Sequence, residues 1–298
     1  MRVVKSTPIT DAMIVSSDIA EPAAGEVIWA AATAYAVGAL AYRPNHRIYR
    51  RRVAGTTATV PESDAVNWEL AGSTNRWAMF DPEISTQSER ASSLTVVLDM
   101  GVADSLALAN LQGSTAEITV TDGAGGPVVY HRLVDLEASS IYDWYTYFFE
   151  PFGQATALVL QDLPPYTNAR LTVVITGPGT VACGTLLFGA AYQIGASQLG
   201  MAAGIRDYSR KTTDAYGLVT YERRRFAKTL RGQVVLDMGA FNGVHRLLES
   251  LLGLVCVWLG DDDGELEPLT AIGFYKDFSL TVNYGTRGYY SLEIEGMT

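Results

Sequence analysis

Short apolar stretches bounded by turn residues recur along most of this chain, and only one stretch has the spacing of a helix. Between residues 82 and 195 these stretches follow one another at regular intervals, which is typical of a two-sheet sandwich. The pattern predicts strands at residues 94–98, 105–110, 116–121, 128–133, 156–161, 170–176 and 181–192. The glycine-rich segment 122–127 predicts a hairpin loop between two of them.

The last third of the chain carries the helical pattern. Apolar side chains between residues 241 and 252 recur at the spacing of one helix face, and Gly253 then provides a helix end. These apolar positions are Phe241, Val244, Leu247, Leu248, Leu251 and Leu252. Strands are expected on both sides of this helix, at residues 218–225, 233–238, 255–259, 273–283 and 289–295.

The front of the chain divides into an arm and a small module. Pro8, Pro22 and Gly25 break any helix in residues 1–25, so we expect an extended N-terminal arm with one short strand. Such an arm either pairs with the sheet edge of a neighbouring subunit or stays a loose terminus. Further strand patterns, at residues 27–29, 39–43 and 47–53, predict a small β module.

These patterns together predict a mainly β protein in four parts. The parts are an N-terminal arm at 1–25, a small aromatic β module at 26–72, a β-sandwich at 73–195, and a β domain with one helix at 196–298. The last strand of the sandwich ends at Gly195, which is the expected seam.

Composition and charge narrow the possible functions. The 298 residues are 48% hydrophobic and only 18% charged, which fits a well-packed globular protein. The net charge of -10 is uneven, because residues 82–195 hold eleven acids and three bases. An acidic domain repels phosphate, so nucleic acid is not an expected partner. No apolar run has the length of a membrane span and no signal-peptide pattern opens the chain, so we expect a protein made in a cytoplasm, without membrane insertion.

Two runs of three arginines are predicted to be exposed on strands or loops. We interpret them as solvated or paired charges at a protein interface. The interface candidates are Arg50, Arg51, Arg52, Arg223, Arg224 and Arg225.

Candidate catalytic and metal-binding residues are scarce. Cys183 and Cys256 lie in apolar surroundings without CxxC spacing, so we expect two buried free thiols. The three histidines lack the spacing of metal ligands, and the sequence contains none of the common nucleophile, phosphate-loop or zinc motifs. We therefore expect no enzyme, no catalytic residues, no cofactor and no metal site.

Residues 142–149 form the most aromatic stretch of the chain. It is interpreted as a plug of the sandwich core, with a contact surface as the alternative. Asp143 and Glu150 flank it as a glycosidase carboxylate pair would, but no other feature supports catalysis. The acidic segment 261–265 lacks the spacing of a calcium loop and is expected to be a solvated hairpin tip.

The aromatic residues of the front module follow a familiar pattern. Trp29, Tyr35, Gly38, Tyr42, Tyr49, Pro61 and Trp68 follow one another as in the chitin- and cellulose-binding modules of bacterial chitinases, which this part of the chain resembles. The resemblance implies that exposed rings stack on sugars. The stacking candidates are Trp29, Tyr35, Tyr49, Trp68 and Trp77. The alternative is that the same rings form the small core of the module.

Two further segments of the sequence resemble bacteriophage structural proteins. The string N-x-W-A-M-F-D at 75–81, followed by the apolar stretch 94–98, resembles the entry into jelly-roll sandwiches of the galactose-binding-like type. The element order of 196–298, with its phrase R-R-F-A-K at 224–228, is similar to the split-barrel part of distal tail proteins, where a lone helix packs on a small barrel.

These resemblances imply a structural subunit of a tailed-bacteriophage virion, at the tail tip, the baseplate or the neck. Its expected partners are copies of itself in a homo-oligomeric ring and other tail proteins, and its expected location is the virion tail. The alternative is a carbohydrate-binding protein that attaches to a host-surface glycan, and a glycan-degrading enzyme is the third hypothesis.

Overall fold

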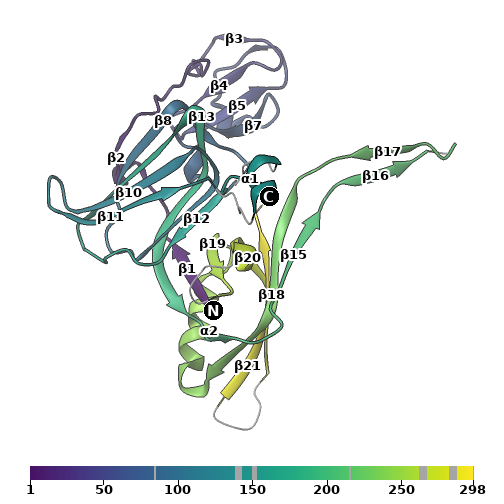
Figure 1. Cartoon of the computed structure of the whole chain (residues 1–298). Helices are drawn as coiled ribbons and strands as arrows, with labels where there is room; N and C mark the ends of the chain where they lie inside the picture. The colour runs from purple at the N-terminus through teal and green to yellow at the C-terminus, as the bar shows by residue number, and fades with distance from the viewer. Residues whose placement is uncertain are drawn as a thin grey trace.

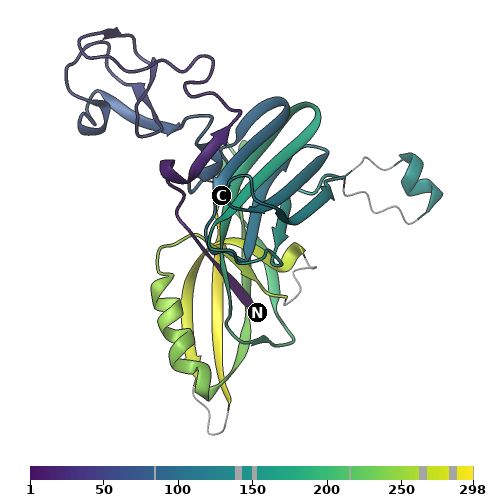
Figure 2. The same cartoon turned by 90° about the vertical axis from the view of Figure 1, so that its left-hand side faces the viewer.

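The computed structural model describes residues 1–298 except for 84, 138–142, 150–152, 215, 262–266, 282–286 and 298. The described chain is mainly β, as predicted, with antiparallel sheets and one longer helix near its C-terminal end (Figures 1 and 2). Fourteen of the described strands belong to one extended sheet, and the others form small separate sheets.

The central part contains β8 (Ser88–Asp99), β9 (Ser105–Gln112), β10 (Thr115–Asp122), β11 (Val128–Asp135), β12 (Ala157–Leu160) and β13 (Ala169–Gln193). The two stretches predicted at 170–176 and 181–192 are one strand of 25 residues, because a register shift between Thr176 and Thr180 replaces the expected turn. The first half of β13 pairs with β8 and β10, and its second half pairs with β9. β13 therefore belongs to two groups of strands, one that contains β8, β10 and β11 and one that contains β9 and β12.

The two groups pack across a common apolar core, and we refer to them together as the sandwich. β10 shows the alternation of a strand with one buried face, because its apolar side chains Ala116, Ile118 and Val120 are all buried. These side chains meet those of β8, β9 and β13, including Leu98, Leu108, Val173 and Phe188. The hairpin loop predicted at 122–127 joins β10 to β11.

The N-terminal strand is part of the interior of the protein. β1 (Arg2–Ser6) is hydrogen-bonded to β13 on one side and to β19 (Cys256–Leu259) on the other. Its alternating side chains enter two cores, since Val3 packs with the C-terminal part and Val4 packs between that part and the sandwich. The first residues of the predicted N-terminal arm are thus a central strand, because both edges of β1 pair with other strands of the same chain. β2 (Ile14–Ser17) pairs with β8.

The C-terminal part is an open sheet with a helix on one face. Its strand order is β19, β20 (Thr270–Thr281), β21 (Arg287–Gly296) and β18 (Phe226–Asp237), and β14 (Ala196–Ser197) pairs with β18. The helix predicted at 241–252 is α2 (Phe241–Ser250), whose Val244 and Leu248 pack onto this sheet. In the described part of the chain these strands do not close into a barrel.

The aromatic module and a β-hairpin extend from this body (Figure 1). The aromatic module contains β3 (Ala34–Tyr35), β4 (Leu40–Tyr42), β5 (Arg47–Arg51), β6 (Gly55–Thr56) and β7 (Trp68–Ser73), so two of its three predicted strands are observed as β4 and β5. The third prediction, 27–29, holds only a single bridge between Ile28 and Tyr42. The second appendage is a hairpin that continues β15 (Ala202–Asp207) and β18 outward as β16 (Arg210–Thr213) and β17 (Val219–Glu222).

Candidate assembly site

The hairpin of β16 and β17, which we call the arm, projects alone from the body (Figure 1). Every residue of both strands is exposed. A two-stranded ribbon is marginally stable by itself in water, and a protein that presents one has an unpaired surface to cover. The cross-strand register places Val219 and Tyr221 on one face of the ribbon, while Glu222 shares the other face with Arg210. Lys211 and Thr213 share the face of Val219 and Tyr221, and the Tyr221 hydroxyl donates a hydrogen bond of 3.4 Å to Asp207 at the end of β15.

The tip of the arm is an ordered turn. The Asp214 carboxylate accepts hydrogen bonds from the backbone N–H groups of Tyr216, at 2.9 Å, and Leu218, at 2.8 Å. Gly217 has a φ of +82°, which a glycine adopts without strain. This turn presents the ring of Tyr216, which is 96% exposed. The described residues of the tip thus present one exposed aromatic ring and one carboxylate.

The base of the arm is anchored to the body. Arg206 donates a hydrogen bond of 3.1 Å to Glu295 of β21, and the Tyr208 hydroxyl donates to the same carboxylate. The hydrogen bond from Tyr208 and the nearby positive charges of Arg206 and Lys276 hold the pKa of Glu295 below its usual value. This ion pair adds to the pairing of β15 with β18, which joins the base of the arm to the sheet.

A groove of about 400 Å³ opens beside this base. It lies between the sandwich and the C-terminal sheet, and its apolar wall includes Ala109, Ala157, Phe226 and Ile272. Ala109 and Ile272 also belong to the core that joins the sandwich to the C-terminal sheet, so the groove is the open end of that core. Arg225, one of the predicted interface residues, lines the same groove.

The second arginine run is exposed, as predicted, where β17 meets β18. Arg224 pairs with Glu222 at 2.9 Å, Arg223 lies near Asp207, and Arg225 faces the groove. These three residues therefore lie together at the base of the arm.

The first arginine run is divided between surface and interior. Arg50 is exposed and lies 3.5 Å from Glu69, and Arg52 is exposed and reaches the backbone of Ala65. The prediction of an exposed Arg51 is wrong, because this side chain is 2% exposed and lies 5.0 Å above the ring of Trp68. Strand alternation places Arg51 on the inner face of β5 together with Tyr49.

The aromatic rings of the module form its core. Trp29, Tyr35, Tyr49 and Trp68 are buried together with Ala41, and Trp68 is only 1% exposed. Tyr35 meets Trp68 edge to face, with ring centroids 5.0 Å apart. Trp77 is half-buried and stacks on His46. This arrangement favours the core interpretation of the rings over sugar stacking, because a stacking platform needs an open ring face.

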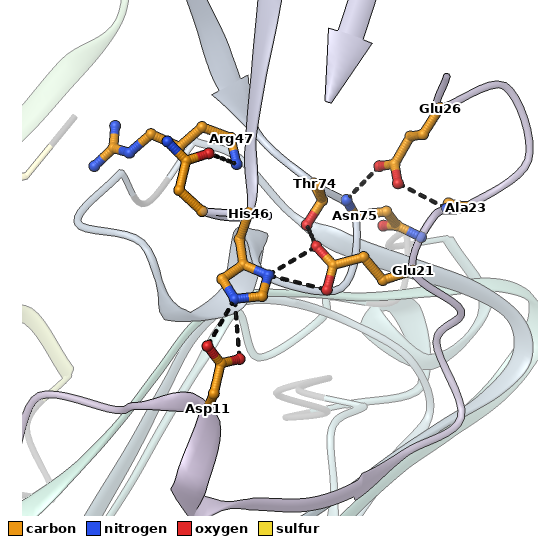
Figure 3. Close-up of polar contacts among 9 residues, drawn as sticks. Asp11, Glu21, Ala23, Glu26, His46, Arg47, Thr74 and Asn75 are labelled. Carbon is orange, nitrogen blue, oxygen red and sulfur yellow. Dashed lines mark hydrogen bonds and ion pairs between the residues drawn. The ribbon is translucent and has the colours of Figure 1, made fainter. Parts of the chain in front are cut away.

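A histidine absent from our predicted sites fixes the junction between module and body (Figure 3). The Nδ1 atom of His46 lies 2.9 Å from Glu21, and its Nε2 atom lies 2.9 Å from Asp11. The Thr74 hydroxyl donates to Glu21 at 2.5 Å. The turn that holds His46, the N-terminal segment and the exit of the module therefore meet at one imidazole.

The environment of His46 favours its charged form. Burial lowers the pKa of His46, but the hydrogen bonds and negative charges of Asp11 and Glu21 outweigh it, so the pKa is raised above the ordinary value of 6.5. A charged imidazole donates from both ring nitrogens, which matches the two carboxylates that face it. No local sequence pattern predicts this contact, because Asp11, Glu21 and His46 lie far apart along the chain.

The aromatic stretch 142–149 is only partly described. In the short helix α1 (Trp144–Phe149), the side chains of Trp144, Tyr145 and Phe148 are exposed. These rings are not a plug of the sandwich core, whose space is filled by side chains of the strands. Glu150 of the carboxylate pair and residues 262–266 of the acidic segment lie outside the described residues, while Asp143 is exposed beside α1.

The predicted state of the cysteines is confirmed, since Cys183 and Cys256 are buried free thiols. Within the described ranges, His, Cys, Asp and Glu side chains form no group of three or more that would hold a metal ion. Among the helices of the described chain, none combines the length and the apolar character needed to cross a membrane.

The sequence matches no model of a protein family, and no curated protein shows significant similarity to it. Inference about function therefore depends on the arm, the groove and the module junction.

Proposed function

We propose that this chain is a structural subunit of a tailed-bacteriophage virion, at the tail tip, the baseplate or the neck, which assembles with copies of itself and with neighbouring tail proteins. The observation that carries the proposal is the arm, a hairpin whose described residues are all exposed and whose base is fixed to the body. Exposed apolar patches mark contact surfaces in soluble proteins, and the arm exposes Tyr216, Leu218, Val219 and Tyr221, so it is best explained as a contact element.

The architecture supports the same proposal. One extended sheet runs from the sandwich through β1 into the C-terminal part, which makes the body a rigid platform for two appendages. As parts of this proposal, the sandwich is a jelly roll of the galactose-binding-like type and residues 196–298 are an opened relative of the split barrel, with α2 as its lone helix. The two-layer packing and the position of the helix support these assignments.

The alternative proposal, a carbohydrate-binding adhesion protein, is supported only by the order of aromatics in the module. The burial of Trp29, Tyr35, Tyr49 and Trp68 leaves it without a ring platform. A glycan array probed with the intact protein separates the two proposals, since only the adhesion protein gives a sugar-specific signal.

The direct test is to locate the protein in particles. Antibodies raised against the recombinant chain are used to label purified virions of the virus that encodes it, and the gold particles are located by electron microscopy. Labelling at one end of the tail or at the neck supports the proposal. Purified virions without the protein, checked by mass spectrometry, would overturn it.

A further inference from the structure

The tip of the arm carries chemical groups that suit the groove at its base. It presents the exposed side chains of Tyr216 and Leu218, and the Asp214 carboxylate accepts hydrogen bonds from the backbone of both residues. The groove has an apolar wall with two cationic side chains, Arg225 and Lys228, on its lining. Its volume of about 400 Å³ lies within the range of roughly 300–1,000 Å³ that accommodates a small organic group, so a phenol ring fits inside.

We infer that the arm of one copy of this chain inserts Tyr216 into the groove of a second copy. This inference rests on the proposed function and names the contact through which the subunits assemble. In the inserted state the Tyr216 ring packs against Ala157 and Ile272, and the Asp214 carboxylate approaches Arg225. An aromatic anchor that fills a pocket beside one charge pair is the usual core of a protein interface.

The groove of the same chain is not accessible to this tip. The arm is an extended ribbon that leads away from the body, and the groove lies at its base, so the tip and the groove occupy opposite ends of one element (Figure 1). The base itself is part of the sheet, because β15 pairs with β18 over its whole length. Only another copy can bring a tip to this groove.

The geometry also fixes the type of assembly. The donor surface and the acceptor surface are different patches of the same chain, so the contact is heterologous and each subunit uses both patches. Head-to-tail contacts of this kind close into a ring when the rotation between copies permits it, and otherwise grow into a filament. In both assemblies each copy inserts its arm into the next copy, and all arms point in the same direction around the ring or along the filament.

The inference is tested with two complementary variants of the full chain. Tyr216→Ala removes the anchor but leaves the groove intact. Thr156→Trp fills the groove from an exposed lining position but leaves the tip intact. Thr220→Ala on the arm and Val66→Trp on the module are matched controls, because both positions are exposed and lie outside the contact.

The readout is the oligomeric state by native mass spectrometry and light scattering, with circular dichroism to confirm folding. Wild type and both controls are expected to form the oligomer, whereas each test variant alone weakens association by about thirtyfold. An equimolar mixture of the two variants is expected to give a one-to-one dimer and nothing larger, because one intact tip meets one intact groove.

Three results would overturn the inference: a wild-type protein that stays monomeric up to high micromolar concentration, test variants that assemble as wild type does, or a mixture of folded variants that forms no dimer. These results are separate from the fate of the proposed function. Virions that contain the protein while the variants still assemble reject only the arm contact, and dimers from a protein absent from virions reject only the virion role.

Discussion

The imidazole of His46 lies flat against the indole of Trp77, with ring centroids 4.1 Å apart and ring planes 11° apart. The same imidazole bridges the carboxylates of Asp11 and Glu21, so the module is held to the body by a stacked and doubly hydrogen-bonded side chain. This contact determines how firmly the module is oriented.

The His46 contact makes the stability of the module junction depend on pH. Because the pKa of His46 is raised above 6.5 in the folded protein, its stabilising contribution is complete below pH 6.5 and is lost as the pH rises through the folded pKa. We expect a loss of about 1 kcal/mol, since the site is partly exposed. The measurement is the thermal unfolding of wild type and His46→Gln across this range of pH, and the variant should lack the dependence.

The control for this experiment is His131→Gln, because His131 contacts a single carboxylate, Glu117, at a half-exposed position. This variant should keep the wild-type pH profile. An unchanged profile in His46→Gln would show that another group is responsible.

The burial of Trp68 predicts that this residue supports folding of the module. Trp68→Ala removes a fully buried ring from a small core and should destabilise the module by about 3–5 kcal/mol. The body has separate cores and should stay folded. Limited proteolysis with mass mapping would then detect cleavage between residues 26 and 72, whereas Val66→Ala, at a 75% exposed position, should resist as wild type does. A Trp68→Ala protein with an intact module would contradict the core interpretation.

The position of β1 predicts that the sandwich and the C-terminal sheet unfold together. Val4→Asp places an unpaired charge in the core between them and should cost about 3–5 kcal/mol. Near-ultraviolet circular dichroism during urea unfolding should show one transition for both parts, shifted to lower urea. Lys5→Ala, on the same strand, should leave the midpoint nearly unchanged because the Lys5 ammonium group is exposed. Two separate transitions in wild type would show that β1 does not couple the parts.

Burial predicts that the thiols are inert in the native state. Desolvation in the sandwich core raises the pKa of Cys183 to about 12, so its thiolate is scarce at neutral pH. Burial also raises the pKa of Cys256. A chromogenic disulfide reagent should label neither thiol in the folded protein and both in denaturant. Rapid labelling of one native thiol would indicate local opening around it.

Local pattern predicted most of the individual strands and the one longer helix. The alternation in β10 and the helical spacing of 241–252 are set by neighbouring residues, so a sequence shows them directly. The Gly177-Pro178-Gly179 segment was misleading, since such residues usually mark a turn but here accompany a bulge inside β13.

Long-range partners could not be predicted in the same way. The pairing of β1 with β13 and β19 joins residues that are distant in sequence, and no local signal encodes it. The cluster of Asp11, Glu21 and His46 is equally non-local. The prediction for Arg51 failed for a different reason. Strand alternation places Arg51 on the same face of β5 as Tyr49, but the charge of its side chain led to the prediction that it is exposed.

The placement of β1 has a consequence for biosynthesis. Arg2 pairs with Gln193 and with Leu259, so β1 is translated well before the strands β13 and β19 that it pairs with. Until then the hydrophobic strand β1 has no partner strands in the nascent polypeptide, and non-local pairing of this kind is slow. Both edges of β1 are therefore paired only after β19 has been translated.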